Sequence, residues 1–304
     1  MNKKVVQFGV WLIILVSIWI VGRICLNCIQ VKEEFLLRIC MSLLYSFTPL
    51  FAVLLTEKSN ILNFKYRPFL KTLPYKSLFK IIFIIAILYP LITLGLTFLF
   101  GNILNVDPFE SISADVVRLN GILLPQSPFF RFIILSIVAL LGALLTGMTL
   151  HLFIALGGEI AWRGFLEREI EVGNRAKKTV IIGLIWGIWV ILPMVVYRSL
   201  HLFNAAFFIE IALTFGFCIV CSFLCVSVLY KTGTIVGAIV VMGLISSFPF
   251  HLLMLITLEL RSSSFVVSYR HLFSIIAVIL IYILINYQHR KHPFIPKENG
   301  IPPG

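Results

Sequence analysis

Charged residues are scarce in this chain of 304 residues, because Asp, Glu, Lys and Arg together make up only 12% of it. Soluble domains carry roughly a quarter. Hydrophobic residues account for 60% of the chain, and the sequence shows neither an internal repeat nor a segment with the composition of a soluble domain. We therefore expect an integral membrane protein, in which the position of the +12 net charge matters more than its total.

The chain also lacks the cysteine pattern of a disulfide framework or a metal site. Its six cysteines all lie in or beside apolar segments: Cys25, Cys28, Cys40, Cys218, Cys221 and Cys225. Disulfide frameworks usually lie in polar loops. The pair Cys25-x-x-Cys28 has no second ligand pair at matching spacing, so a redox or zinc site is not favoured. We expect the cysteines to pack between helices, and we predict neither a metal nor a cofactor.

Long apolar runs dominate the sequence, and eight of them approach the roughly 20 residues that a helix needs to cross a bilayer. They cover residues 8–29, 35–56, 80–104, 130–157, 179–198, 205–229, 234–258 and 270–287. The expected fold class is an all-α, polytopic membrane helical bundle. The first run follows Lys3 and Lys4, and since no small-x-small cleavage site follows it, a retained signal anchor is favoured over a cleaved signal peptide.

The distribution of positive charge predicts the orientation of the bundle. With the N-terminus in the cytoplasm, most of the 25 Lys and Arg residues fall in cytoplasmic stretches. The longest outer loop, 105–129, instead carries three acidic residues against the single Arg118. The positive-inside rule then places both termini in the cytoplasm, and the absence of an organelle signal suits a bacterial cell membrane. The net charge needs no nucleic acid partner.

The chain divides into three parts: N-terminal helices over 1–129, a core over 130–258, and a last helix with a tail over 259–304. Within the first part, the basic cytoplasmic loop 57–79 mixes Lys and Arg with Phe, Tyr and Leu. It is either a segment that binds acidic lipid headgroups of the inner leaflet or an ordinary basic loop. The tail 288–304 contains four prolines and is predicted to be disordered or extended.

The densest group of charges beside an apolar run lies in GGEIAWRGFLE, residues 157–167. Ionisable groups near a membrane segment are costly, so they are more informative than apolar positions. Glu159, Arg163 and Glu167 recur every four residues and would form one stripe with two possible ion pairs on a helix. The alternative is a solvated helix face with no function.

At this point the sequence resembles the CAAX-protease and bacteriocin-processing (CPBP, or Abi) intramembrane proteases, which have eight or so helices. The family's first motif is Glu-Glu-x-x-x-Arg followed by Gly-Phe-Leu, and residues 157–166 read GGEIAWRGFL. The second motif is Trp-Gly-x-Trp-His with a proline shortly after, and residues 186–193 read WGIWVILP. The last is His-x-x-x-Asn after a Thr-Gly-Ser-like turn, and here TGT at 232–234 precedes MGLIS at 242–246. The resemblance covers residues 130–250 and implies a CAAX-protease-like fold.

This chain departs from the family at the positions whose side chains carry out the proteolytic chemistry. In the family the first Glu activates water, two His assist it or hold a metal, and the Asn helps to stabilise the oxyanion. Those positions are occupied here by Gly158, Val190, Met242 and Ser246. None of these side chains is a general base or a ligand for a hard cation, and the serine offers one hydrogen bond.

Glu159 and Arg163 are the charged motif residues that remain. One step along a helix turns a side chain by about 100°, so Glu159 should point away from the site that its neighbour serves in the family. We expect Glu159 to form an ion pair with Arg163 that fixes the end of the helix. No residue is therefore predicted to be catalytic.

Histidines elsewhere could rebuild a site. His151 lies two turns before Glu159, whereas His201 and His251 lie near the outer ends of their spans, away from the cytoplasmic side on which the family's chemistry takes place. We interpret the latter two as interfacial residues.

The sequence leaves three alternative hypotheses for the function. We favour a catalytically inactive member of the family, a pseudoprotease that holds or regulates another membrane or envelope protein, as in bacteriocin immunity. The second is a diverged intramembrane endopeptidase that depends on Glu159 and Arg163. The third is a transporter or channel, which should show broken helices or charges deep in several spans, whereas the sequence offers only Arg23 and Arg38 near helix ends.

Overall fold

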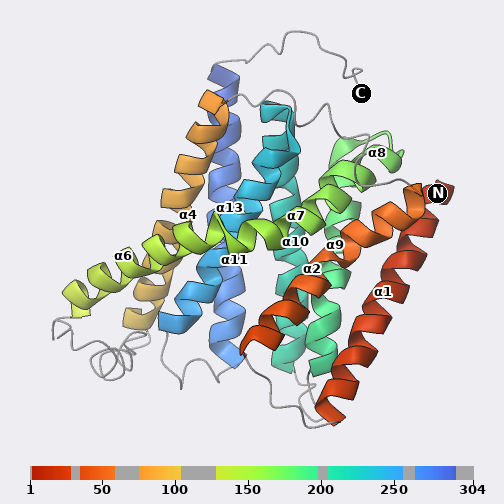
Figure 1. The fold of residues 1–304 in the computed structure, drawn as a ribbon. Helices are drawn as coiled ribbons and strands as arrows, with labels where there is room; N and C mark the ends of the chain where they lie inside the picture. The colour runs from red at the N-terminus through yellow and green to blue at the C-terminus, as the bar shows by residue number, and fades with distance from the viewer. Residues whose placement is uncertain are drawn as a thin grey trace.

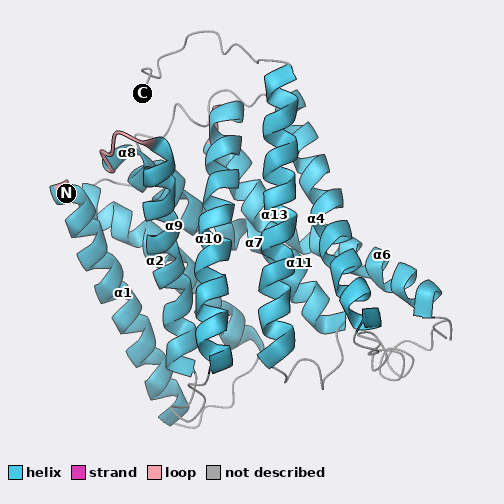
Figure 2. Ribbon diagram, turned by 180° about the vertical axis from the view of Figure 1, so that it is seen from behind, coloured by secondary structure: helices cyan, strands magenta, loops and turns pink. Residues whose placement is uncertain are grey.

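The computed structural model describes residues 2–28, 35–58, 75–103, 128–197, 205–255 and 264–291, and within these ranges every regular element is a helix (Figure 1, Figure 2). The helices are α1 (Lys3–Cys28), α2 (Phe35–Glu57), α4 (Tyr75–Ile103), α6 (Pro128–Gly147), α7 (Leu150–Glu159), the π-helical η2 (Ile160–Leu166), α8 (Glu167–Glu169), α9 (Arg175–Tyr197), α10 (Ala205–Thr232), α11 (Ile235–Leu255) and α13 (Ser264–Lys291). The all-α prediction is confirmed for this part of the chain.

Five helices, α1, α2, α4, α9 and α10, are long and apolar enough to cross a membrane, and a sixth span is obtained if α6 and α7 with its continuation are counted together. The shorter apolar helices Ile235–Phe248 and His271–Tyr287 lie within α11 and α13. Five to six helices of this kind indicate an integral membrane protein. The eight spans of the sequence analysis stay a prediction, as does the side of the membrane on which the termini lie.

The outer faces of these helices are apolar, as expected for a surface that contacts lipid. Ile13 and Ile18 on α1, Phe83 on α4 and Leu141 on α6 are all more than half exposed. A water-soluble protein would bury most such side chains. In a bilayer the same surface is favourable, because the helices satisfy their own backbone hydrogen bonds.

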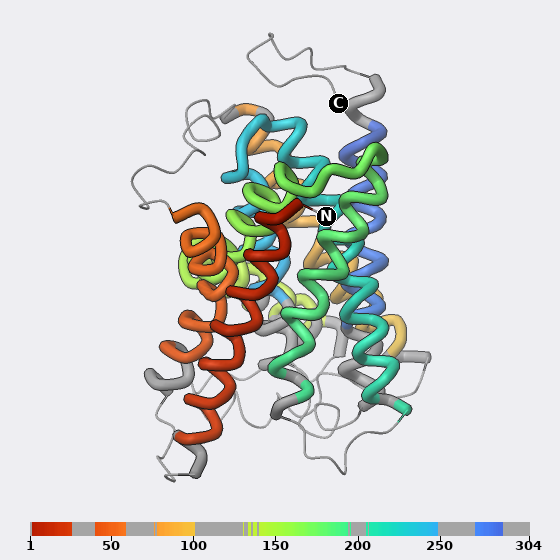
Figure 3. Tube along the Cα trace, turned by 90° about the vertical axis from the view of Figure 1, so that its right-hand side faces the viewer, coloured from red at the N-terminus to blue at the C-terminus, as the bar shows by residue number. Residues whose placement is uncertain are grey.

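The helices pack through small residues as well as through large ones. α1 lies along α2, as Figures 1 and 3 show, and α10 packs between α9 and α13. A Cβ on Gly157 of α7 would lie 2.6 Å from the carbonyl oxygen of Ser46 on α2, and a Cβ on Gly183 of α9 would lie 2.8 Å from the Cα of Ile219 on α10. Only glycine allows such close approach of two backbones, which is typical of helix packing in membranes.

The fourth predicted span is not a single helix, and this corrects the sequence analysis. α6 ends at Gly147, α7 begins at Leu150, and the two axes meet at 53°. Figure 1 shows the pair crossing the bundle from the lower left toward α8. The expectation that the spans are unbroken is therefore wrong at this position.

Contacts with α11 and local hydrogen bonds explain the break. The Thr146 and Thr149 hydroxyls donate to the carbonyl oxygens four residues earlier, at 2.9 and 2.7 Å, and such bonds often bend helices. A Cβ on Gly147 would lie 2.8 Å from Ser247 Oγ of α11, and Ser247 Oγ itself donates to Ala143 O at 2.8 Å. α11 thus packs closely against the chain at the break, where a Cβ on Gly243 would also lie 2.6 Å from the Gly147 carbonyl oxygen.

Two predicted boundaries also change. α4 begins at Tyr75, so residues 75–79 of the predicted loop 57–79 are helical, and 59–74 lie outside the described residues. α13 continues to Lys291, so the start of the predicted tail 288–304 is helical, and 292–304 lie outside the description. Of the predicted outer loop 105–129, only residues 128 and 129 are described, and they belong to α6.

One end of the bundle gathers the start of α1, the end of α2, the start of α4, α8, the start of α9 and the ends of α10 and α13 (Figure 1). We call it the basic end, because Lys3, Lys4, Arg168, Arg175 and Lys231 lie there. The N-terminus is held at this end, since Asn2 Nδ2 donates to Glu169 Oε2 at 3.0 Å and Lys4 Nζ lies 3.8 Å from Glu169 Oε1. This is the end that the sequence predicts to be cytoplasmic.

Candidate functional site

The first motif lies where α7 passes into η2. The π-helical turn begins directly after Glu159 and contains Trp162 and Arg163. Such turns are rare and are often found at functional sites. Gly158, which the resemblance would place at the catalytic Glu position, lies against Trp162, since a Cβ on this glycine would approach Trp162 Nε1 to 3.0 Å. A longer side chain at position 158 would have to displace the indole ring.

Glu159 and Arg163 form an ion pair inside the protein. Arg163 Nε lies 3.3 Å from Glu159 Oε2, and the two side chains are 0% and 2% exposed, respectively. The predicted ion pair is thus present in the structure. The alternative of a solvated helix face is wrong, because the side chains are enclosed by neighbouring helices.

α9 and α10 complete the surroundings of Arg163. Arg163 Nη2 donates to Ser222 Oγ at 3.2 Å, and the guanidinium carbon lies 5.2 Å from the centre of the Trp186 ring, a cation–π contact. The Cys225 thiol of α10 also lies near the guanidinium. The guanidinium therefore joins η2 to both α9 and α10.

The buried pair is not fully satisfied by hydrogen bonds. Glu159 Oε2 and Arg163 Nε are within ion-pair distance but are not aligned as donor and acceptor, and Arg163 Nη1 has no hydrogen-bond partner within the described residues. A charge in this position depends strongly on its partner, because both side chains are almost completely buried.

Glu167 departs from the stripe predicted for the three charges. Its carboxylate Oε1 accepts a hydrogen bond from the Tyr230 hydroxyl at 3.3 Å, and its backbone carbonyl accepts one from Lys178 Nζ at 2.9 Å. The side chain is buried, at 7% exposure of the residue. Glu167 thus connects α8 to α9 and α10 at the basic end, rather than continuing the Glu159–Arg163 pair.

Trp162 of the first motif and Trp189 of the second belong to a cluster of rings that joins α1, α2, η2 and α9. We call it the aromatic cluster: Phe8, Trp19, Tyr45, Trp162, Phe165 and Trp189. Trp162 and Trp189 have centroids 6.0 Å apart, and Tyr45 stacks on Trp189 with centroids 4.7 Å apart and planes at 9°. Aromatic pairs of this kind stabilise beyond the area they bury.

Hydrogen bonds orient the same rings. Trp189 Nε1 donates to Thr48 Oγ1 at 3.0 Å, the Tyr45 hydroxyl donates to the Trp189 carbonyl, and Trp19 Nε1 donates to Met41 O at 2.9 Å. The motif tryptophans therefore have a structural role that requires no catalysis. Tyr45 and Thr48 were not singled out from the sequence, although polar groups within an apolar run are a signal of helix–helix hydrogen bonds.

The remaining positions expected from the family lie on separate helices. Val190 is half-buried on α9, and Met242 is 5% exposed on α11, both within the main apolar core. Ser246, one turn further along α11, contacts His151 of α7, with 3.1 Å between Oγ and Nδ1, and also donates to Gly243 O at 3.2 Å. The structure thus pairs His151, one of the three other histidines considered, with a motif position.

The two other histidines are not tested. His201 lies outside the described residues, and the side chain of His251 is not described. Within the described ranges, no three His, Cys, Asp or Glu side chains come together in a way that could hold a metal ion. Cys218, Cys221 and Cys225 are free and buried on α10.

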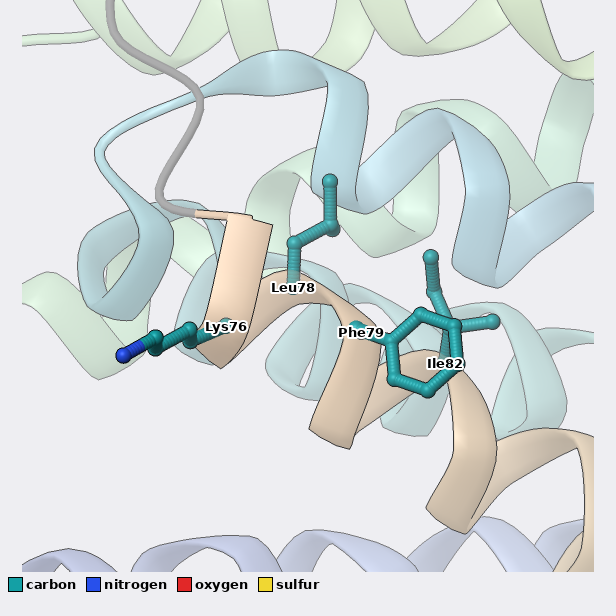
Figure 4. Close-up of a pocket in the computed structure, with 4 residues that line it drawn as sticks. All are labelled: Lys76, Leu78, Phe79 and Ile82. Atoms are coloured by element: carbon teal, nitrogen blue, oxygen red, sulfur yellow. The ribbon is translucent and has the colours of Figure 1, made fainter.

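Two cavities of substantial size lie at the basic end. One, of about 590 Å³, opens at the first turns of α4 and is lined by Lys76, Leu78, Phe79 and Ile82. Figure 4 shows the Lys76 side chain extending away from the three apolar side chains. This arrangement suits a lysine whose stem lies in lipid and whose ammonium reaches the headgroups. The second cavity, of about 450 Å³, lies between α9, α10 and α13.

Comparisons of the chain with protein-family models, with curated proteins and with solved structures find no match. The resemblance to the CPBP proteases therefore rests on the motif residues alone.

Proposed function

We propose that this chain is a catalytically inactive relative of the CPBP intramembrane proteases, which uses the helical bundle to hold or regulate another membrane or envelope protein. The observation that carries the proposal is the enclosed Glu159–Arg163 pair. Glu159 pairs with Arg163, and the Arg163 guanidinium in turn joins η2 to α9 and α10. The Glu159 carboxylate is 2% exposed and therefore does not reach a substrate.

The side chains at the family's chemical positions support the same proposal. A water-activating base needs a carboxylate or imidazole within hydrogen-bond reach of the water. Gly158 lies against Trp162, and Met242 is buried in the apolar core. Neither provides such a group, whereas the tryptophans that organise the bundle are retained.

The partner is proposed to be a protein of the same membrane or of the envelope, because α1, α4 and α6 present exposed apolar faces at which another transmembrane helix can pack. The experiment is purification of the C-terminally tagged full chain from its native membrane in mild detergent. A partner recovered in near-equal amount, with no peptide cleavage by the complex, supports the proposal. Cleavage that is abolished by Glu159→Gln contradicts it.

A second candidate is a diverged hydrolase, and the His151–Ser246 contact favours it. A hydroxyl within hydrogen-bond reach of an imidazole is the minimal arrangement of a nucleophile and its base. Under this reading Ser246→Ala abolishes cleavage of a membrane peptide while the bundle stays folded. Undiminished peptide cleavage by the Ser246→Ala variant excludes the hydrolase that uses this serine.

A transporter or channel is the third candidate, and the break between α6 and α7 is the one observation in its favour, since discontinuous helices often line transport sites. A flux assay in liposomes tests it, with a Gly157→Leu variant, in which α7 is displaced from α2, as the control.

A further inference from the structure

The cavity at the basic end is lined by α9, α10 and α13, and Figure 2 shows where these three helices lie in the bundle. Its volume is about 450 Å³, within the range of small-molecule sites. Its described lining is Arg175, Ala176, Thr179, Phe223, Val226, Ser227, Tyr230, Lys231, Tyr282 and Asn286. None of these residues takes part in the Glu159–Arg163 pair or the aromatic cluster.

The lining changes from polar to apolar along the helices. Tyr230 and Lys231 lie near the end of α10, whereas Phe223 lies seven residues earlier, which is about 10 Å deeper at 1.5 Å per residue. On α13, Asn286 lies at the polar level and Tyr282 one turn deeper. A ligand that fills the cavity must therefore be polar at the basic end and apolar toward the middle of the bundle.

Two cations stand at the polar level. The Arg175 guanidinium lies over the Tyr230 ring, with 3.2 Å from Cζ to the ring centre. Lys231 Nζ donates to the Ile285 carbonyl and to Asn286 Oδ1, both at 2.8 Å. These contacts fix the direction of each cation without neutralising its charge, since the partners are a ring, a carbonyl and an amide.

Hydroxyl and amide groups surround the cations. Ser227 Oγ donates to Asn286 Oδ1 at 2.9 Å, and Asn286 Nδ2 donates to Tyr282 O at 2.9 Å. Glu167 of the neighbouring α8 interacts electrostatically with Arg175; its carboxylate accepts a hydrogen bond from the Tyr230 hydroxyl and is not part of the lining. The described wall of the cavity thus carries two positive charges and no negative one.

We infer that this cavity binds one anionic phospholipid, with its phosphate between Arg175 and Lys231 and an acyl chain along Phe223 and Tyr282. Basic pockets between transmembrane helices are suited to acidic headgroups. The exposed face of α13 is apolar, at Ile279, Leu280 and Ile283 for example, so the lipid enters sideways from the bilayer. This inference is independent of the proposed scaffold role.

Binding of diacyl phosphatidylglycerol to the purified full chain, measured by native mass spectrometry, tests the inference, with phosphatidylcholine as the neutral lipid. The decisive variant is the double substitution Arg175→Gln with Lys231→Gln. Loss of two charges near the membrane surface should weaken phosphatidylglycerol binding roughly thirtyfold. Lys177→Gln is the matched control, because Lys177 is exposed on the same turn of α9 but does not line the cavity.

A second variant separates charge from folding. Arg175→Lys with Lys231→Arg keeps both charges and should bind phosphatidylglycerol within a few-fold of the natural chain. Equal binding of the neutral and the anionic lipid, or no loss in the double Gln variant, overturns the inference. Displacement of the lipid by inorganic phosphate at similar concentration also overturns it, because the ligand is then a free anion rather than a lipid.

Discussion

Replacing Glu159 by Ala leaves the Arg163 guanidinium charged and enclosed, with Ser222, the Cys225 thiol and the Trp186 ring as remaining neighbours. Removing one partner of a buried ion pair typically costs about 3–5 kcal/mol, because an uncompensated charge stays in a medium that solvates it poorly. Both side chains are at most 2% exposed, so water does not screen the loss. We expect Glu159→Ala to lower the free energy of unfolding by this amount.

The double variant Glu159→Leu with Arg163→Met should be much less destabilised than Glu159→Leu alone or Arg163→Met alone, the two single variants that complete this cycle. Apolar residues of similar volume often replace a buried pair at little cost. Thermal unfolding in detergent, followed by near-UV circular dichroism, gives the four free energies of the cycle, from which the coupling between the two residues is obtained. Ser246→Ala serves as a control on α11, away from the pair.

Additive effects of the two single substitutions would refute this reasoning, since they would mean that the two side chains do not depend on each other. A Glu159→Ala variant as stable as the natural chain would do the same.

Three further predictions concern packing and hydrogen bonds. Gly157→Ala places a Cβ 2.6 Å from a backbone oxygen of α2 and should destabilise the bundle by about 2 kcal/mol. Gly95→Ala, at an open position, is the control and should cost nothing. Thermal unfolding compares the two variants, and equal stability would contradict the close packing of α7 on α2. Trp189→Phe removes the donor to Thr48 and should cost roughly 1–2 kcal/mol; unchanged stability in thermal unfolding speaks against the contact. Ser246→Ala should cost about 0.6 kcal/mol and leave partner binding intact, and loss of a peptide-cleaving activity would favour the hydrolase instead.

The sequence predicts the helices well because each apolar run is a local property. The start of α2 and of α10 coincides with the predicted spans, and the all-α class follows from composition. The break between α6 and α7 could not be predicted in this way, since Gly147 and the threonines beside it look like any small residues in an apolar run. The break depends on the close approach of α11, about a hundred residues later in the chain.

In the candidate site, too, the local features can be predicted from the sequence and the contacts between distant helices cannot. The Glu159–Arg163 pair follows from a spacing of four residues on one helix. Its enclosure does not, because Trp186 and Ser222 come from α9 and α10. Likewise, Arg175 and Lys231 lie 56 positions apart, and the sequence shows them only as positive charges on the same side of the membrane. Their meeting in one cavity is a property of the folded bundle.

Recovery of a stoichiometric partner is the measurement that tests the central proposal most directly. The full chain, tagged at its C-terminus, is purified in mild detergent from its native membrane, together with the Glu159→Leu and Arg163→Met double variant. The scaffold account predicts that the same membrane or envelope protein is recovered in near-equal amount with both. If no partner is found, and a membrane peptide accumulates in cells carrying the double variant because cleavage has stopped, the chain is a protease and the account is wrong.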